Sequence, residues 1–353
     1  MALWLARCGR HGQFESKYLD DCRIYLTWSN LKDDIRGLKT KAELREYLLP
    51  SYPDASVAKV SNHLGQIWAF VQKMEPGDWV VVPSKRQPAV HIAEITGPCE
   101  FVNTLEPVLK HSRSVKWIAT DVPRSNFAQD ILYSLGAIMT ICKIERNDAE
   151  ARVRRMATQG WRESGILPTP VTPTLDDDSE EAVGDGVPSD LEEVAKDQIA
   201  RQILARYKGH GMARLVDAIL KAQGYETHVS PEGPDKGVDL LAAPGSLGFG
   251  EPRLCVQVKS GDAPLDRPTL DQLIGTMQNF HASHGLLVSW GGFKSTVDKE
   301  KAAQFFRVRL WDRDDLIDQL FEHYEHLGDE LRAELPLKRI WTVATTEVGD
   351  DGE

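Results

Sequence analysis

Apolar positions in the first 160 residues alternate between the spacing of a helix and the spacing of a strand. A helix that ends near Gly77 is predicted because apolar residues recur every three or four positions, at Val57, Val60, Leu64, Ile67, Trp68, Val71 and Met74. Two β-prone runs at 79–82 and 90–95 are joined by a short polar segment, which predicts a hairpin. This part of the chain is therefore predicted to be α+β.

After residue 200 the spacing of apolar residues changes. The segment from Met212 to Gln223 has one apolar face and stops at Gly224, so it is predicted to be a helix. Strands are predicted for the short β-prone runs at 225–229, 238–242, 254–259, 285–290 and 307–311, with helices at 270–281, at 295–305 and from 314 onward. This order is typical of an α/β sheet with helices on its faces.

The segment between these halves has little that could fill a core. Residues 166–188 contain four prolines, and nine acidic residues without any Lys or Arg lie between residues 166 and 195. Proline removes backbone donors and like charges repel, so an extended linker is predicted. The predicted organisation is a domain at 1–160, an acidic linker at 161–189, a second domain at 190–335 and an acidic tail at 336–353.

Charge and cysteine content exclude few classes of protein. The formal net charge is -11. Because the linker and the tail carry this acidic excess, charge neither supports nor excludes a polyanionic partner. Five cysteines without CxxC spacing argue against a disulfide framework or a zinc site. No run is apolar and long enough to span a bilayer and no signal peptide is recognisable, so we expect a cytoplasmic protein with no membrane partner.

Candidate chemistry lies on the predicted strand 254–259. Cys255, Gln257 and Lys259 share one face of this strand because side chains alternate with a period of two, and the other face is apolar. Such polar groups are costly to bury without a partner or a purpose. Asp239 begins the preceding predicted strand, so a hairpin between the two strands would bring it close to Gln257 and Lys259.

These residue types suit the hydrolysis of a phosphodiester bond. Asp239 offers an anionic ligand to Mg²⁺ or Mn²⁺, while Gln257 and the backbone carbonyl of Val258 offer neutral oxygens. Lys259 can orient the attacking water and stabilise the charge that develops on the phosphate. Taken singly, each residue also suits a turn cap or a solvated strand end.

The pattern Gly237-Val238-Asp239 followed by Val256-Gln257-Val258-Lys259 resembles the core of the PD-(D/E)XK nucleases. It is most similar to the variant of Mrr-like restriction endonucleases, in which Gln replaces the second acid. The resemblance covers about 205–325 and implies a restriction-endonuclease-like α/β fold and metal-dependent endodeoxyribonuclease activity. Ala213 stands where the family often carries an acid, which puts a second metal site in doubt; Asp217, one turn further on, is a candidate substitute.

The runs 76–83, 91–97 and 112–117 are similar to the small β-barrel domains of the PUA-like and EVE group. This resemblance implies a reader domain that holds a modified or flipped-out base between aromatic side chains. The candidate nucleic-acid contacts are Trp28, His11, Gln13, Lys85, Arg86 and Arg113 in the first domain, and Gln278, Ser289 and Lys294 in the second.

Together these features predict a modification-dependent, type IV-like restriction enzyme that defends against foreign DNA. Cutting both strands needs two active sites, so a homodimer or a DNA-induced oligomer is expected. Two alternatives stay open: a structure-specific nuclease of repair or recombination, and a non-catalytic nucleic-acid-binding protein that retains the nuclease fold.

Overall fold

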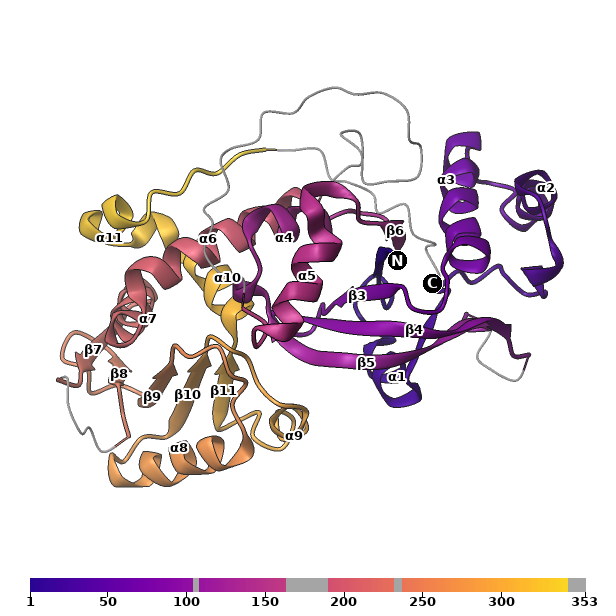
Figure 1. Ribbon diagram of the computed structural model, residues 1–353. Coiled ribbons are helices and arrows are strands. Elements are labelled where there is room, and N and C mark those ends of the chain that lie inside the picture. The colour runs from indigo at the N-terminus through magenta and orange to yellow at the C-terminus, as the bar shows by residue number, and fades with distance from the viewer. Residues whose placement is uncertain (104–107, 163–189, 232–236, 342–353) are drawn as a thin grey trace. The chain divides into compact units, whose positions relative to one another are not determined.

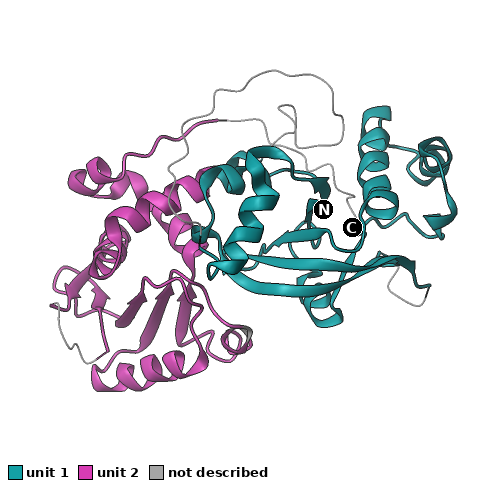
Figure 2. Ribbon diagram, viewed as in Figure 1, with its two compact units in different colours: residues 1–194, 343–353 teal, residues 195–342 magenta. Residues whose placement is uncertain are grey.

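The computed structural model describes residues 1–103, 108–162, 190–231 and 237–341, which fall into two compact units (Figures 1 and 2). Unit 1 comprises residues 1–194 together with 343–353, and unit 2 comprises residues 195–342. Residues 163–189 of the predicted linker and 342–353 of the predicted tail lie outside the described ranges. Each unit has hydrophobic clusters of its own.

Unit 1 contains a six-stranded sheet in the order β2-β5-β4-β3-β1-β6. β1 and β3 are parallel, and the other neighbours are antiparallel. The predicted hairpin is confirmed by the pairing of β3 with β4, in which Trp79 faces Glu94. The strands are β1 (Leu3–Ala6), β2 (Arg23–Tyr25), β3 (Trp79–Pro83), β4 (Ala89–Phe101), β5 (His111–Pro123) and β6 (Ile141–Lys143).

The sheet of unit 1 is open. Within the described residues its edge strands β2 and β6 each pair with a single neighbour, so the small β-barrel that the PUA-like and EVE resemblance implied is not formed. A barrel buries the inner face of its strands, whereas helices cover both faces of this sheet. The apolar surface that a barrel would enclose is buried here without closure.

Strand residues of unit 1 alternate between two cores. Leu3 and Leu5 of β1 pack with α4 (Gln129–Leu135) and α5 (Ala149–Thr158), which lie together over one face (Figure 1). Trp4 packs into the opposite core with the remaining helices. Those helices are α1 (Glu15–Asp21), α2 (Lys41–Ser51) and α3 (Val57–Trp68), and the shorter turns of the unit are η1 (Ile35–Gly37), η2 (Ala69–Lys73), η3 (Arg124–Asn126) and η4 (Arg146–Asp148).

Unit 2 contains a five-stranded mixed sheet in the order β11-β10-β9-β8-β7. β9, β10 and β11 run parallel, while β7, β8 and β9 pair antiparallel. The predicted α/β sheet is thereby confirmed. Its strands are β7 (Tyr225–Val229), β8 (Leu240–Pro244), β9 (Leu254–Lys259), β10 (His284–Ser289) and β11 (Val308–Trp311).

Helices cover both faces of this second sheet. One face packs against α6 (Leu191–Tyr207), α7 (His210–Ala222) and α10 (Arg313–His323), and the other against α8 (Arg267–Asn279) and α9 (Ser295–Asp298). The chain continues through η5 (Tyr324–His326) and α11 (Asp329–Glu334). No helix within the described ranges is both long enough and apolar enough to cross a membrane.

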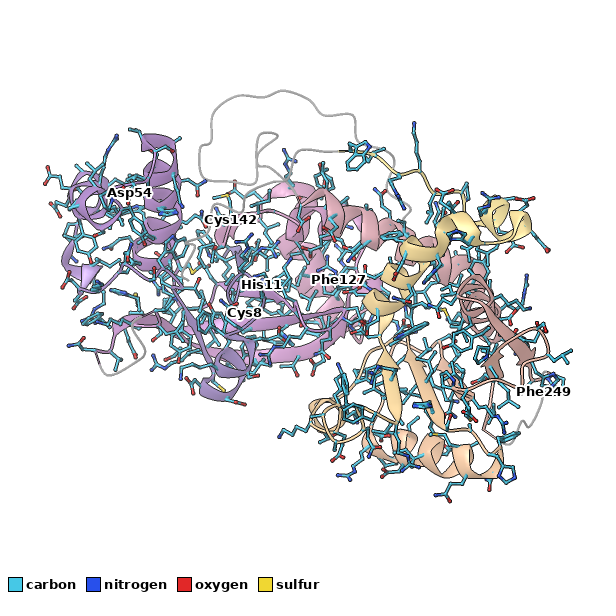
Figure 3. The ribbon with its side chains drawn as sticks, turned by 180° about the vertical axis from the view of Figure 1, so that it is seen from behind. Cys8, His11, Asp54, Phe127, Cys142 and Phe249 are labelled. Carbon is cyan, nitrogen blue, oxygen red and sulfur yellow. The ribbon has the colours of Figure 1, made fainter. Side chains whose placement is uncertain are left out.

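All five cysteines are free thiols, and only Cys22 is exposed. Burial raises the pKa of Cys8 and Cys142 to about 12, and that of Cys99 and Cys255 to about 11. Figure 3 labels Cys8 and Cys142 among the side chains of unit 1. The buried thiols therefore stay protonated at neutral pH.

Candidate active site

The antiparallel pairing of β8 with β9 brings Asp239 to Gln257. Leu240 pairs with Val256, and one residue earlier the Asp239 N–H donates to the Val256 carbonyl at 3.0 Å. Continuing this register by one residue sets Asp239 across from Gln257. The Val258 N–H donates to Asp239 Oδ2 at 2.7 Å, so two hydrogen bonds on either side of Gln257 hold the aspartate in place.

Gln257 is a buried amide with an unsatisfied oxygen. The side chain is 2% exposed, and its Oε1 has no hydrogen-bond partner among the described residues. It lies on the same strand face as Cys255, which packs with the residues of α8. Leaving such an acceptor unpaired costs about 1–3 kcal/mol, so Oε1 can accept a hydrogen bond or coordinate a cation.

Oxygen donors dominate the positions around this pair. The Asp239 carboxylate, the Gln257 amide oxygen and the Val258 backbone carbonyl are the hard ligands that Mg²⁺ or Mn²⁺ accepts, with waters and phosphate oxygens completing the shell. No cluster of three or more His, Cys, Asp or Glu side chains suited to a metal occurs in the described part of the chain. The residues therefore fit a divalent ion held by few protein ligands, and not a closed structural metal centre.

Lys259 ends β9 on the same face as Gln257, two residues further along, and its side chain is exposed. The end of β9 is held by hydrogen bonds to the Lys259 backbone and to the side chain of Ser260, the residue that follows it. The Trp290 N–H donates to the Lys259 carbonyl at 2.9 Å, and Ser260 Oγ accepts from the Gly209 N–H at 3.0 Å. The backbone of Lys259 is therefore fixed, while its ammonium group is accessible to solvent.

Two polar residues of α8 that sequence reasoning missed lie beside this site. A Cβ atom on Gly237 would lie 3.5 Å from Gln272 Nε2 and 3.6 Å from Thr276 Oγ1. Gly237 itself has a φ of +84°, which favours glycine. In the sequence, Gln272 and Thr276 could have been identified by their spacing of four residues, which places both side chains on one face of the predicted helix.

The structure leaves Asp239 without a second acid from α7. Ala213 is buried in the core beneath the sheet. Asp217 is engaged elsewhere, since Thr227 Oγ1 donates to its Oδ1 at 2.5 Å and Lys221 Nζ lies 2.9 Å from its Oδ2. These contacts oppose the interpretation that Asp217 replaces the missing family acid.

The three other candidates of unit 2 have different environments. Ser289 is fully buried and its hydroxyl donates to the Gly292 carbonyl at 2.7 Å, so a direct DNA contact is excluded by its packing. Gln278 is exposed on α8, and Lys294 is exposed after the Gly291-Gly292 turn. Both remain accessible to a phosphate group.

Two candidates of unit 1 are core residues, which corrects the prediction for them. Trp28 is 2% exposed and packs edge-on against His63, so it does not line an open pocket. Arg113 is 3% exposed and donates to the carbonyls of Phe70, Gly97 and Val71. Its guanidinium is used within the fold and does not face a phosphate in solvent.

The other candidates of unit 1 lie at the surface. His11 and Gln13 are exposed, and Gln13 Oε1 accepts from the His11 N–H at 3.0 Å within their own loop. Arg86 Nη1 donates to Ser16 Oγ at 2.8 Å. Lys85 forms an ion pair at 3.0 Å with Glu193, a residue that the sequence did not single out.

Unit 1 also contains a cavity of about 660 Å³. Its walls include Trp4, two basic residues, Lys73 and Lys143, and three acidic residues, Glu75, Asp78 and Glu145. Trp4 Nε1 donates to Asp78 Oδ2 at 2.9 Å, so the indole edge is already paired. The tryptophan on this wall is Trp4, a strand residue, whereas the sequence favoured Trp28 because of its polar neighbours.

Residues 204–320 match a family model described as restriction endonuclease (Mrr_cat). Residues 4–141 match a domain of unknown function, DUF8426, which lends no support to the PUA-like and EVE-like resemblance. No curated protein sequence matches the chain.

Two similar solved structures are restriction endonucleases. The DNA modification-dependent restriction endonuclease AspBHI is 16% identical with a TM-score of 0.33, over 79% of this chain and 71% of that chain. The MspJI restriction endonuclease in complex with a 27-mer oligonucleotide is 16% identical with a TM-score of 0.31, over 85% of this chain and 70% of that chain. TM-scores of this size do not establish a shared fold.

Proposed function

We propose that Asp239, Gln257 and Lys259 catalyse magnesium-dependent hydrolysis of DNA, since residues 204–320 match the restriction endonuclease family model Mrr_cat. One observation carries the proposal. Asp239, fixed by two hydrogen bonds to β9, stands opposite a buried glutamine whose Oε1 has no partner in the described part of the chain. Buried polar side-chain atoms usually have a hydrogen-bond partner, so an unpaired amide oxygen opposite a fixed carboxylate suits a ligand position.

The three side chains would have different roles in this reaction. Asp239 and Gln257 would hold Mg²⁺ or Mn²⁺, together with the Val258 carbonyl. A divalent ion bound there supplies a water of lowered pKa and polarises the phosphorus centre. Lys259 would neutralise the negative charge that develops on the phosphate, and the pinned end of β9 keeps its backbone in place for that role.

Replacing Gln257 with leucine separates metal binding from folding. Leucine has a similar volume and no oxygen to leave unpaired, so in EDTA the Gln257→Leu variant should be about 1 kcal/mol more stable than wild type. Mg²⁺ should raise the melting temperature of wild type, because it binds only the folded state, and should no longer raise that of the variant.

The matched control for this measurement is Gln278→Leu, which makes the same change at an exposed position of α8. Its magnesium-dependent shift should equal that of wild type, as followed by thermal unfolding across a magnesium titration. An unchanged shift in Gln257→Leu would remove Gln257 from the set of metal ligands.

The activity itself is tested by plasmid cleavage. Wild-type protein is incubated with unmodified plasmid, with cytosine-modified plasmid and with a branched DNA, in Mg²⁺, in Mn²⁺ and in EDTA, and the products are separated on a gel. Cleavage in Mg²⁺ that stops in EDTA is expected. Cleavage of only branched DNA would favour a repair nuclease, and DNA binding without any cleavage would favour the non-catalytic alternative.

We further propose that unit 1 inspects DNA for a modified base. The cavity of about 660 Å³, which has a tryptophan and side chains of both charges on its walls, is the feature that supports this role. Faster cleavage of the modified plasmid is the expected result. Because two strands must be cut, we also expect a homodimer or an assembly that forms on DNA.

A further inference from the structure

Three cationic side chains from separate segments of unit 1 converge on one carboxylate. Arg7 follows β1, Lys85 lies in the turn between β3 and β4, and Arg124 begins η3. Arg124 Nη1 is 2.9 Å from Glu193 Oε1, Lys85 Nζ is 3.0 Å from Oε2, and Arg7 Nη2 is 3.7 Å from Oε2. Each oxygen of Glu193 therefore meets a different cation.

Arg7 is held in place independently of that carboxylate. Its Nε donates to the Ala137 carbonyl and its Nη2 to the carbonyls of Leu135 and Ala137, at 2.8–3.1 Å. The side chain is 8% exposed, yet its Nη1 has no hydrogen-bond partner among the residues that the structure describes. A buried guanidinium that keeps a donor unused is preorganised for an anion larger than the one now present.

The arrangement suits the two non-bridging oxygens of a phosphodiester. Arginine and lysine make most charged contacts to DNA phosphates, and their hydrogen bonds to an anionic oxygen are short and strong. Burial alone would raise the pKa of Glu193, but Arg124, Arg7 and Lys85 outweigh it and lower that pKa to about 2. Glu193 thus offers the cluster a permanent negative charge, as a phosphate would.

Glu193 also belongs to the most acidic stretch of the chain. Nine acidic residues and no basic residue occur between residues 166 and 195, and Asp190, one helical turn before Glu193, lies 3.9 Å from Lys85 Nζ. Asp190 and Glu193 both contact the basic cluster, as a competitor for nucleic acid would.

We propose that Arg7, Lys85 and Arg124 form a binding site for a backbone phosphate of DNA, and that Glu193 occupies this site when DNA is absent. The inference rests on the proposed function, because it assumes that DNA is the substrate. It assigns unit 1 a phosphate contact that does not depend on which base is read.

The test is the salt dependence of DNA binding by the full-length protein. Anisotropy of a fluorescein-labelled, unmodified duplex is measured in EDTA between about 50 and 200 mM salt, where each neutralised phosphate adds about 0.9 to the slope of log K against log salt. Glu193→Gln should bind the duplex roughly tenfold more tightly at the low-salt end, with a slope steeper by about 0.9. Adding Lys85→Gln to this variant should return the slope to that of wild type.

Glu46→Gln is the matched control, because it removes the same charge from an exposed position of α2 in the same unit. Equal slopes for Glu193→Gln, Glu46→Gln and wild type would overturn the proposal and leave the ion pairs a structural role. If inorganic phosphate raises the melting temperature of Glu193→Gln while duplex binding is unchanged, the site takes small anions and the assignment to DNA is wrong.

The binding assay tests the phosphate site and the plasmid assay tests the nuclease, so either proposal can be refuted without the other. Because binding is measured in EDTA, a steeper slope in a protein that cleaves no plasmid would retain the phosphate site and refute the nuclease. Conversely, if wild type cleaves plasmid but Glu193→Gln does not change the salt slope of DNA binding, the nuclease is supported and the phosphate site is refuted.

Discussion

Asp239→Asn will lower metal-dependent DNA cleavage by at least about 10³-fold, equivalent to about 4 kcal/mol of transition-state stabilisation. The amide oxygen can still accept the hydrogen bond that the Val258 N–H now donates to Oδ2, so the turn before β8 keeps its geometry. What is lost is the negative charge that a divalent cation requires. The initial rate of plasmid cleavage in saturating Mg²⁺ measures the effect.

Asp271→Asn is the control for this experiment. It makes the same substitution on α8 of the same unit, at a carboxylate that is 59% exposed and pairs at 3.7 Å with Arg267. Its cleavage rate should stay within about twofold of wild type, because an exposed ion pair contributes little. A wild-type rate in Asp239→Asn would remove Asp239 from the active site and move the search to another part of unit 2.

Arg113→Met will lower the free energy of unfolding of unit 1 by about 3 kcal/mol. Arg113 donates to three backbone carbonyls, and each hydrogen bond from a charged group contributes about 1.5–3 kcal/mol before the cost of burying the cation. That burial lowers the pKa of Arg113. Methionine fills part of the volume but satisfies none of the carbonyls.

Denaturation by urea, followed by tryptophan fluorescence, measures this loss. Six of the nine tryptophans precede residue 195, so the signal reports mainly on unit 1. Arg86→Met, at an exposed arginine that donates to Ser16 Oγ, should cost less than about 1 kcal/mol. Unchanged stability together with weaker DNA binding in Arg113→Met would instead restore the sequence-based interpretation of Arg113 as a phosphate contact.

The candidate active site was predictable because its geometry is local. A period of two places Gln257 and Lys259 on one face of β9, and the adjacent strand β8 carries Asp239 to that face. The apolar alternation also predicted the hairpin of β3 and β4 correctly. In these cases the pattern and the pairing lie within about 20 residues of each other along the chain.

The sequence misled where burial depends on distant segments. Trp28 has polar neighbours along the chain, but it is covered by His63 and the core around it. The sheet of unit 1 includes a parallel pairing of β1 with β3, in which Leu3 lies beside Trp79. No local pattern in the sequence predicts this long-range pairing. Likewise, nothing near Arg7 in the sequence points to Leu135 or to Glu193.

The cysteine distribution makes the native protein suitable for spectroscopic labelling. Cys22 is the only exposed thiol, and the raised pKa values of the four buried thiols keep them in the unreactive protonated form. A maleimide probe should therefore attach to unit 1 at one position without prior removal of cysteines. Adding Gln278→Cys would place a second label on unit 2, and a pair of spin labels would then report how far apart the units lie before and after DNA is added.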